Sequence, residues 1–389
     1  MTQNHSQTLE FILKWQSEFA HHTDRFLFPV VDKTDLNLPG DLQAQLDNLP
    51  VNESAYLNPE LQVQLPLEAI QPIGNSGFRV KPLIGRFYPR HIIAGHPGID
   101  HHDRQPMRVI KTDSTSFTVD FNHPLSDLGV EISARPIDQP GMDQADSGAS
   151  IEPMTLALGS GIGLQRTYKR GPDFYHNNSF NRQDTGNDAI FYQQERLVNH
   201  IDQSASNEIA TIYGRELLPG IKVLDLMSSV QSHLPKDIVD LNVTGLGMND
   251  SELSANPQLN QHIVHDLNLY PVLPFDNDHF DIVLCSLSIE YLVEPIRVLR
   301  EAARVTRPGG KLLISFSNRF FPTKAIAIWH ELHPFERLGL ILDLLLKVGK
   351  LDDLKTESLQ GQPRAADDIY FRQLKTGDPV FVVSATVKE

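Results

Sequence analysis

Polar side chains lie at the ends of three apolar runs in the second half of the chain. Asp225 lies near the end of IKVLDL, Asp266 near the end of HIVHDL, and Ser286 near the end of FDIVLCSL. Continuous apolar runs of this length are typical of parallel strands that are buried on both faces. Because the carboxyl ends of parallel strands open into a common crevice, their carboxylates and hydroxyls are placed to bind a ligand. The sequence therefore predicts a ligand site at this edge of a sheet.

Each carboxylate also has a purely structural interpretation. Asp225 could accept backbone N–H bonds from the loop that follows it, and Asp266 could cap a helix or a turn. Both interpretations stay open beside ligand contact. Glu290, Tyr291 and Asn318 are expected near the strand ends, where they could position a second substrate or only pack against neighbours. The pattern identifies no catalytic base.

The elements that must position these side chains follow from the alternation of patterns after Pro219. A helix is predicted over 294–306, and RPGG at 307–310 ends it, because proline lacks an N–H donor and glycine accepts positive φ. Strands are predicted over 221–226, 241–246, 262–267, 280–287, 311–317 and 378–386. Strands that alternate with helices indicate a doubly wound α/β domain with a parallel sheet. We place this domain at residues 189–389.

Three blocks of this half, VLDL, LPFDNDHFDIVLCSLSIEYL and RVTRPGGKLLISFSN, resemble the type-11 branch of the class I S-adenosylmethionine-dependent methyltransferases in order and spacing. The resemblance implies a Rossmann-like fold, S-adenosyl-L-methionine as cofactor and methyl transfer as activity. It further implies that the loop after the first strand wraps the methionine part of the cofactor. An acid after the second strand would bind the ribose hydroxyls, and an acid after the third would bind the adenine amine.

Carried over residue by residue, the resemblance predicts cofactor contacts at Asp225, Met227, Ser228, Ser229, Met248, Asp266, Leu267 and Ser286. Two departures stand out. The loop over 227–233 contains no glycine, although glycines let a backbone approach a ligand closely. Gly247 occupies the position of the ribose acid, and Asn249 and Asp250 are the nearest substitutes. The loop is therefore expected to follow another path or to offer serine hydroxyls.

The N-terminal half carries the signature of a different domain. MRVIKTD, SFTVDFN and GVEISARPI alternate apolar and polar residues, which predicts an antiparallel sheet. The run SFTVDFNHPLSDLGVEISARPI at 116–137 resembles the C-terminal strands of SlyD-like, FKBP-type prolyl isomerases. The resemblance extends over residues 38–137 and implies an FKBP-like α+β domain, mainly of antiparallel β structure. It implies either a substrate-binding or structural module or a peptidyl-prolyl isomerase.

Two further segments complete the expected organisation. Phe11, Ile12, Trp15 and Phe19 have helical spacing, so an amphipathic helix is predicted near the start of the chain. A stretch rich in Pro, Gly, Asp and Ser after residue 136 predicts a linker. The expected order is an N-terminal helix and lead-in (1–37), an FKBP-like domain (38–137), a linker (138–188) and a methyltransferase-like domain (189–389).

Charge and composition exclude several classes of protein. The chain has 34 basic and 49 acidic residues and a net charge of −15, which repels nucleic acid and anionic membranes. A single cysteine, Cys285, excludes an intrachain disulfide, and no export signal is evident, so we expect a cytoplasmic protein. Four histidines, at 91, 96, 101 and 102, lack the spacing of a defined metal site, and we expect no bound metal.

Three functions are consistent with these patterns. The first is an S-adenosylmethionine-dependent methyltransferase whose FKBP-like module binds a protein acceptor; a small-molecule acceptor also stays open. The second is a non-catalytic binding or chaperone-like protein on a degenerate methyltransferase scaffold, which the missing glycines and ribose acid favour. The third is a peptidyl-prolyl cis-trans isomerase in the N-terminal half.

Overall fold

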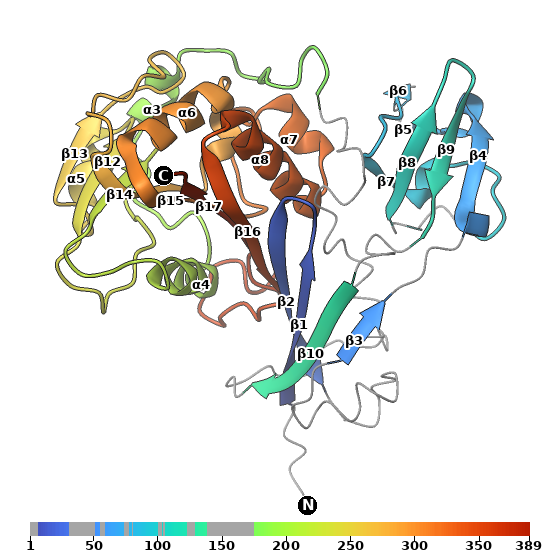
Figure 1. The fold of residues 1–389 in the computed structure, drawn as a ribbon, viewed down its shortest axis with the longest axis horizontal. Helices are drawn as coiled ribbons and strands as arrows, with labels where there is room; N and C mark the ends of the chain where they lie inside the picture. The colour runs from blue at the N-terminus through green and yellow to red at the C-terminus, as the bar shows by residue number, and fades with distance from the viewer. Residues whose placement is uncertain are drawn as a thin grey trace, which may run out of the picture. The chain divides into compact units, whose positions relative to one another are not determined.

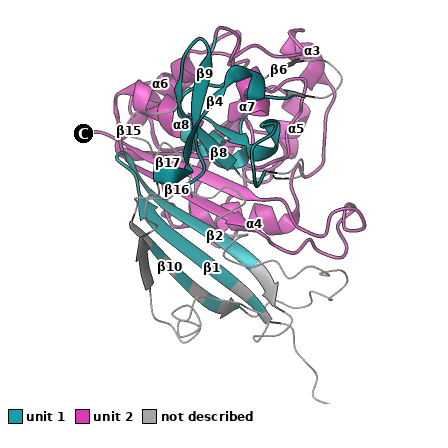
Figure 2. Ribbon diagram, turned by 90° about the vertical axis from the view of Figure 1, so that its right-hand side faces the viewer, with its two compact units in different colours: residues 1–176, 332–339 teal, residues 177–331, 340–389 magenta. Residues whose placement is uncertain are grey.

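The computed structural model divides the chain into two compact units, coloured teal and magenta in Figure 2. Unit 1 comprises residues 1–176 and 332–339, and unit 2 comprises residues 177–331 and 340–389. The structure describes residues 7–30, 51–54, 59–73, 78–79, 81–99, 103, 106–122, 129–137 and 175–389. His101, His102 and the predicted linker from 138 to 174 lie outside the described residues.

Unit 1 is built mainly from antiparallel strands in its described part. The strands are β1 (Gln7–Gln16), β2 (Ala20–Val30), β3 (Val51–Ser54), β4 (Gln62–Pro66), β5 (Pro72–Ile73), β6 (Phe78–Arg79), β7 (Phe87–Pro89), β8 (Pro106–Thr112), β9 (Ser116–Asp120) and β10 (Gly129–Ile137). One run of strands has the order β2-β1-β10-β3, a second sheet has the order β4-β9-β8-β7, and β5 pairs with β6. Short 3-10 turns lie at Pro59–Leu61, Leu67–Ala69 and Arg90–Ile92.

The prediction of an amphipathic helix near the start of the chain is wrong. Residues 7–16 form β1, which pairs with β2 on one side and β10 on the other. Phe11, Leu13 and Trp15 are buried, and the residues between them are more exposed. This period of two is that of a strand with one face in the core. Phe11, Ile12, Trp15 and Phe19 also fit a helical period, but that period leaves out Leu13, which lies on the buried face of the strand.

The predicted sheet of the N-terminal half is correct for two of its three strands. β8 and β9 form an antiparallel hairpin, and their buried residues Met107, Val109, Phe117 and Val119 make a core. β10 is a strand as predicted, but it pairs with β1 and β3 rather than with this hairpin. Alternation predicts a strand and does not identify its partner. The FKBP-like fold of this half stays a prediction.

Unit 2 contains seven strands and most of the helices. The strands are β11 (Lys222–Leu226), β12 (Asn242–Gly247), β13 (Gln261–Val264), β14 (Phe280–Ser286), β15 (Thr306–Phe316), β16 (Leu351–Gln360) and β17 (Val380–Val387). Their order is β13-β12-β11-β14-β15-β17-β16. β11 to β15 pair in parallel, and β17 runs antiparallel between β15 and β16. The doubly wound α/β fold predicted for this half is confirmed.

Helices cover both faces of this sheet, as Figure 1 shows for α6 and α8 on one side and α4 on the other. The helices are α3 (Asp188–Gln193), α4 (Gln203–Gly214), α5 (Asp250–Ala255), α6 (Pro295–Val305), α7 (Ala327–Glu331) and α8 (Pro334–Val348), with a 3-10 turn at Ile289–Tyr291. On α4, Ile209 and Tyr213 pack in one core with Ile282 and Leu284 of β14. Burial on both faces explains the uninterrupted apolar runs of the central strands.

Two details of unit 2 differ from the sequence interpretation. Residues 307–310, predicted as a turn, lie within β15, where the register with β14 jumps from Thr306 to Lys311 and Gly309 adopts a φ of 74°. Residues 177–188, assigned to the linker, are part of unit 2 and bond to the loop after β15 through Asp184 N and Thr323 O, 2.8 Å apart. Among the residues described, no helix is long and apolar enough to cross a membrane.

Candidate functional site

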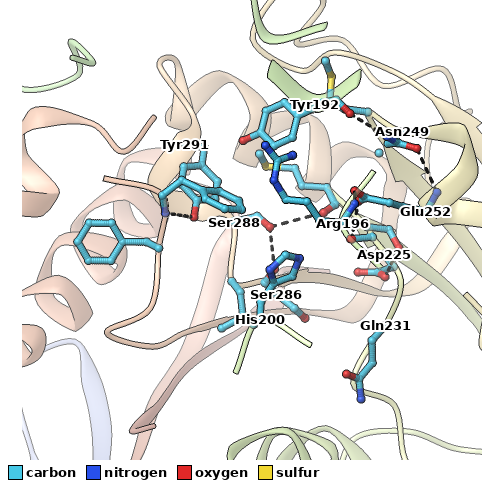
Figure 3. A pocket seen from close by; sticks show the side chains of 18 of the residues that line it. Tyr192, Arg196, His200, Asp225, Gln231, Asn249, Glu252, Ser286, Ser288 and Tyr291 are labelled. Atoms are coloured by element: carbon cyan, nitrogen blue, oxygen red, sulfur yellow. Dashed lines mark hydrogen bonds between the residues drawn. The ribbon is translucent and has the colours of Figure 1, made fainter. Parts of the chain in front are cut away.

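A cavity of about 330 Å³ lies within unit 2 at the carboxyl ends of β11, β12, β13 and β14 (Figure 3). β11 has β12 on one side and β14 on the other, so the strand order reverses here, which is where doubly wound folds bind ligands. The eight residues predicted from the sequence all line the cavity: Asp225, Met227, Ser228, Ser229, Met248, Asp266, Leu267 and Ser286.

Asp225 ends β11 with a carboxylate that is almost completely buried. Burial raises its pKa from 3.8 to about 6, although hydrogen bonds from Ser228 and Ser232 oppose the shift. Ser228 Oγ donates to Asp225 Oδ2 over 2.6 Å. The carboxylate thus orients the loop that follows it through serine hydroxyls rather than through the predicted backbone N–H bonds, and Asp225 also lines the cavity.

The glycine-free loop after β11 packs directly on the end of β12. Ser228 N donates to Leu246 O over 2.9 Å. A Cβ atom on Gly247 would lie 2.2 Å from the carbonyl oxygen of Ser228, which is far inside van der Waals contact. The close backbone approach therefore depends on a glycine in β12 rather than on glycines in the loop. The same contact explains why no ribose acid can stand at Gly247.

Backbone strain marks two of the strand ends at the cavity. Met227 after β11 has a φ of 56°, and Leu287 after β14 has a φ of 54°. Residues with a Cβ rarely adopt this left-handed region, and such strain persists where the surrounding contacts impose it. Both residues line the cavity.

The substitutes for the ribose acid proposed from the sequence have other partners. Asn249 Oδ1 caps α5 by accepting from Glu252 N over 3.1 Å, and Asn249 Nδ2 donates to Tyr192 O over 2.8 Å. Asp250 is 74% exposed and contacts His262 at 2.9 Å. Asp250 does not line the cavity, and Asn249 lines it with its side chain already engaged.

The structure brings Glu252 to the cavity instead. Its carboxylate is buried and accepts from Arg196 N and from Ser229 Oγ, each over 2.7 Å. A glutamate three residues after a helix cap normally bonds back to the cap's own N–H. In this protein the Glu252 side chain instead contacts Ser229 in the loop after β11. The N-x-x-E spacing from Asn249 to Glu252 is typical of helix capping and does not by itself indicate a contact with this loop.

Asp266 forms a turn after β13. Its Oδ1 accepts from Asn268 N over 2.9 Å and from Leu269 N over 3.1 Å. The structural interpretation is therefore correct, and the half-buried carboxylate also lines the cavity beside the buried Leu267.

Ser286 at the end of β14 belongs to a chain of hydroxyls. Tyr213 OH lies 2.9 Å from Ser286 Oγ and donates to Ser315 Oγ over 2.7 Å. Burial raises the pKa of Tyr213, so this phenol stays protonated. Ser288 Oγ donates to Ser286 O over 2.7 Å, which fixes the strand end.

The three residues suggested as acceptor contacts differ in placement. Tyr291 lines the cavity, and its OH accepts from Phe321 N over 2.9 Å. Glu290 is fully buried and raises the pKa of Tyr291, an effect second to burial itself. Asn318 is exposed and does not line the cavity.

Residues 178–200, called here the α3 segment, contribute a wall that the sequence did not predict. Asp188 of α3 accepts from Lys324 Nζ over 2.9 Å, from Arg182 Nη1 over 2.8 Å and from Asn268 Nδ2 over 3.0 Å. Burial alone would raise the pKa of Asp188, but these hydrogen bonds lower it below its ordinary value. Asp188 is therefore a carboxylate that ties the segment to the loop after β15.

Two buried polar atoms at the cavity have no hydrogen-bond partner among the residues described: Gln231 Oε1 and Tyr192 OH. Gln231 Nε2 is already fixed, since it donates to Ser206 Oγ over 2.8 Å. Buried polar groups are almost always satisfied. Both residues line the cavity, so its wall includes one acceptor and one hydroxyl that no described residue satisfies.

Comparison with known proteins agrees with this geometry. Residues 229–314 match the family model of a methyltransferase domain. The chain is 32% identical over 92 residues to the ubiquinone/menaquinone biosynthesis C-methyltransferase UbiE of Laribacter hongkongensis, which covers 23% of this chain and 36% of that protein. It is 34% identical over 116 residues to the UbiE of Shewanella sediminis, which covers 27% of this chain and 45% of that protein. The chain thus spans less than half of either relative.

A solved S-adenosylmethionine-dependent methyltransferase from Aquifex aeolicus is 15% identical, covers 48% of this chain and 94% of that chain, and has a TM-score of 0.33. Residues 229–314, which match the methyltransferase family model, lie within the doubly wound sheet of unit 2 and include most of the strand ends that line the cavity.

Proposed function

We propose that unit 2 binds S-adenosylmethionine in this cavity and transfers its methyl group to an acceptor. One observation carries the proposal: the eight positions that the family resemblance assigns to the cofactor come from four separate strand ends and line the same cavity. The unpartnered Gln231 Oε1 and Tyr192 OH support the same interpretation.

The charges of the cavity fit this cofactor. Its sulfonium and ammonium groups are positive and its single carboxylate is negative, and the cavity is lined by the carboxylates of Asp225, Glu252 and Asp266 together with two arginines. Attraction between opposite charges is stronger in a partly buried site than in water. We assign Asp266 to the adenine end, and Glu252 to the ribose position that Gly247 cannot serve.

Methyl transfer requires the protein mainly to hold the cofactor and the acceptor in the correct positions. When bound, S-adenosylmethionine supplies an electrophilic methyl group, and its transfer is an in-line displacement. Holding two reactants in line accounts for a large part of the acceleration in such reactions. The chain's residues would therefore bind, orient and exclude water. No general base is assigned.

Calorimetry tests the proposal. S-adenosylhomocysteine titrated into the full chain should bind saturably, and Glu252→Gln should weaken this binding about tenfold, the size expected for a charge-assisted hydrogen bond. The matched control is Glu294→Gln, since Glu294 is exposed and pairs with Arg297 on the surface. Absence of binding by the wild-type chain at millimolar ligand would refute the proposal. Transfer of label from methyl-labelled cofactor to a cell-extract component would rule out the non-catalytic alternative.

A further inference from the structure

Two arginines line the cavity together with the carboxylates described above: Arg196 in the α3 segment and Arg319 in the loop after β15. In a chain with a net charge of −15, a pair of guanidinium groups supplies two positive charges beside the four carboxylates that line the same cavity. Arg196 forms no ion pair with any residue in the described ranges, and the carboxylate nearest to Arg319, that of Asp378, is 3.9 Å away. Asp378 Oδ1 already accepts from Arg364 Nη2 over 2.8 Å, so Arg319 has only this one long ion pair in the described ranges.

Aromatic rings hold both guanidinium groups. The Arg196 guanidinium carbon lies 4.7 Å from the centre of the Phe191 ring and 5.2 Å from that of Phe321. The Arg319 guanidinium carbon lies 4.5 Å from the ring centre of Tyr370. Stacking on a ring covers the flat face of a guanidinium and leaves the N–H groups at its edge available.

The hydrogen bonds of Arg196 leave donors unused. Nη1 donates to Gln194 O over 3.0 Å, and Nη2 donates to Phe191 O over 3.3 Å. A guanidinium has five N–H donors in a planar fork that matches carboxylate and phosphate groups. Arg196 is thus fixed in position and can still bind an anion.

The neighbouring lining is aromatic. Phe320, Phe321, Tyr291 and Tyr370 line the cavity with the two arginines. The rings of Tyr291 and Phe321 lie 5.8 Å apart and are tilted by 32°. Rings at such separations pack well against a flat apolar or aromatic body. Their combination with two guanidinium groups selects a ligand with both features.

We propose that the methyl acceptor is a small aromatic molecule bearing a carboxylate or phosphate, which Arg196 and Arg319 bind while the aromatic side chains hold its ring. The inference rests on the proposed function and names the substrate class of the same cavity. In the reaction, a lone pair of the acceptor forms the bond to the methyl carbon, the carbon–sulfur bond breaks toward sulfur, and the proton of the acceptor leaves to water. The net charge of −15 disfavours an extended nucleic acid in this role.

The test uses the full chain with and without saturating S-adenosylhomocysteine, and three probes: benzoate, phenyl phosphate and neutral benzamide. At least one anion should bind about tenfold more tightly than benzamide, the difference expected for a charge-assisted contact. Comparison of the two anions then distinguishes a carboxylate from a phosphate acceptor.

Substitutions of the two arginines test whether these residues bind the anionic group of the probe. Arg319→Gln and Arg196→Lys should each weaken the preferred anion about tenfold and leave benzamide unchanged, because only the charge or the planar fork is altered. The matched control Arg297→Gln removes a surface guanidinium that pairs with Glu294 over 3.1 Å, and it should change nothing. Thermal unfolding near the wild-type midpoint establishes that the variants are folded.

Two results would overturn the inference: anions that bind no more tightly than benzamide, or variants that bind all three probes as the wild type does. If the wild-type chain does not bind S-adenosylhomocysteine, the proposed function is refuted. The anion titration without this ligand then still decides whether the arginine pair is an anion site.

Discussion

Asp225 illustrates how burial sets the charge of a single residue at the cavity. Its folded pKa of about 6 lies above the ordinary 3.8, because burial disfavours the ionised form. A carboxyl whose pKa is raised binds its proton more tightly in the folded state. Stability is therefore lost as the pH rises from about 4 to about 6, when the folded state must accept a buried charge.

Asp225→Asn removes this penalty. Relative to the wild type, the variant should gain up to about 3 kcal/mol of unfolding free energy between pH 4 and pH 7, since each pKa unit corresponds to about 1.4 kcal/mol. Urea unfolding reports the change through Trp329 of α7, the tryptophan of unit 2, in a Trp15→Phe background. A pH-independent difference would contradict the assignment.

Asp281 supplies a control of opposite sign. Burial alone would raise its pKa, but hydrogen bonds from Lys222 N and the Arg307 guanidinium lower it. Its carboxylate therefore stabilises the fold above the unfolded pKa, and this contribution is lost as the pH falls. Asp281→Asn should be less stable than the wild type at neutral pH, and the difference should shrink toward low pH.

Gly247 provides a steric prediction. In Gly247→Ala the new Cβ would meet Ser228 O at 2.2 Å and Leu253 Cδ2 at 3.1 Å, so backbone must move. Overpacking of this kind costs about 1–3 kcal/mol and should also weaken S-adenosylhomocysteine binding by displacing the loop after β11. Gly214→Ala is the control, because its Cβ would find its nearest neighbour, Pro235 Cγ, at 3.4 Å. Equal effects of the two substitutions would refute the close-approach argument.

At the residue scale, the sequence predicted the part of the cavity that belongs to strand ends. Asp225, Asp266 and Ser286 are recognisable because a residue at the end of a buried strand has its position fixed by the strand itself. Glu252 and Arg196 were missed. Their roles arise from contact between elements distant in the sequence, such as the bond from Arg196 N to Glu252 across 56 positions.

At the element scale, the α3 segment depends on one buried lysine. Lys324 is 0% exposed and contacts Asp184 Oδ2 at 3.1 Å and Asp188 Oδ1 at 2.9 Å. Lys324→Met should cost about 1.5–3 kcal/mol, because the buried Asp188 carboxylate loses one of its two cationic hydrogen-bond donors and keeps only Arg182. Hydrogen exchange should rise in residues 178–193 before it rises in β11 or β14.

Lys347→Met is the matched control for that experiment. Lys347 pairs with Asp343 one helical turn earlier in α8, but its side chain is 43% exposed, so the pair is screened by water. Its loss should leave exchange in the α3 segment unchanged. Faster exchange in both variants, or in neither, would contradict the role assigned to Lys324.

The elements themselves were predictable where one pattern dominated. α6 and the central strands have single, clear periods, and the structure confirms them. β16 was missed because its pairing with β17 shifts register between Asp352 and Lys355, which breaks the alternation. β1 was mistaken for a helix because Phe11 and Trp15 fit both a helical and a two-residue period until Leu13 is counted. Local patterns cannot report the pairing that decides such cases.

At the scale of the whole molecule, unit 1 includes residues from a distant part of the chain. Glu336 Oε1 accepts from Arg86 Nε and from Phe87 N, each over 3.0 Å, and both charged groups are buried. Removing one member of a buried ion pair costs about 3–5 kcal/mol. Glu336→Gln should therefore destabilise unit 1 by an amount of this order.

Hydrogen exchange measured across both units checks this expectation. Protection should fall in β8 and β9 of unit 1 and persist in β11 and β14 of unit 2. Glu18→Gln, at an exposed position of unit 1, should alter neither. Protection that falls first in unit 2 would show that Glu336 does not act within unit 1.

The position of β17 has a consequence for how the protein is made. β17 lies between β15 and β16, yet the ribosome synthesises it after both of them. Until Val380–Val387 pair with them, β15 and β16 each present an unpaired strand edge. Unpaired edges are templates for association between chains. A delay before β17 pairs should therefore increase aggregation of newly made protein, and chaperone binding should be concentrated in that interval.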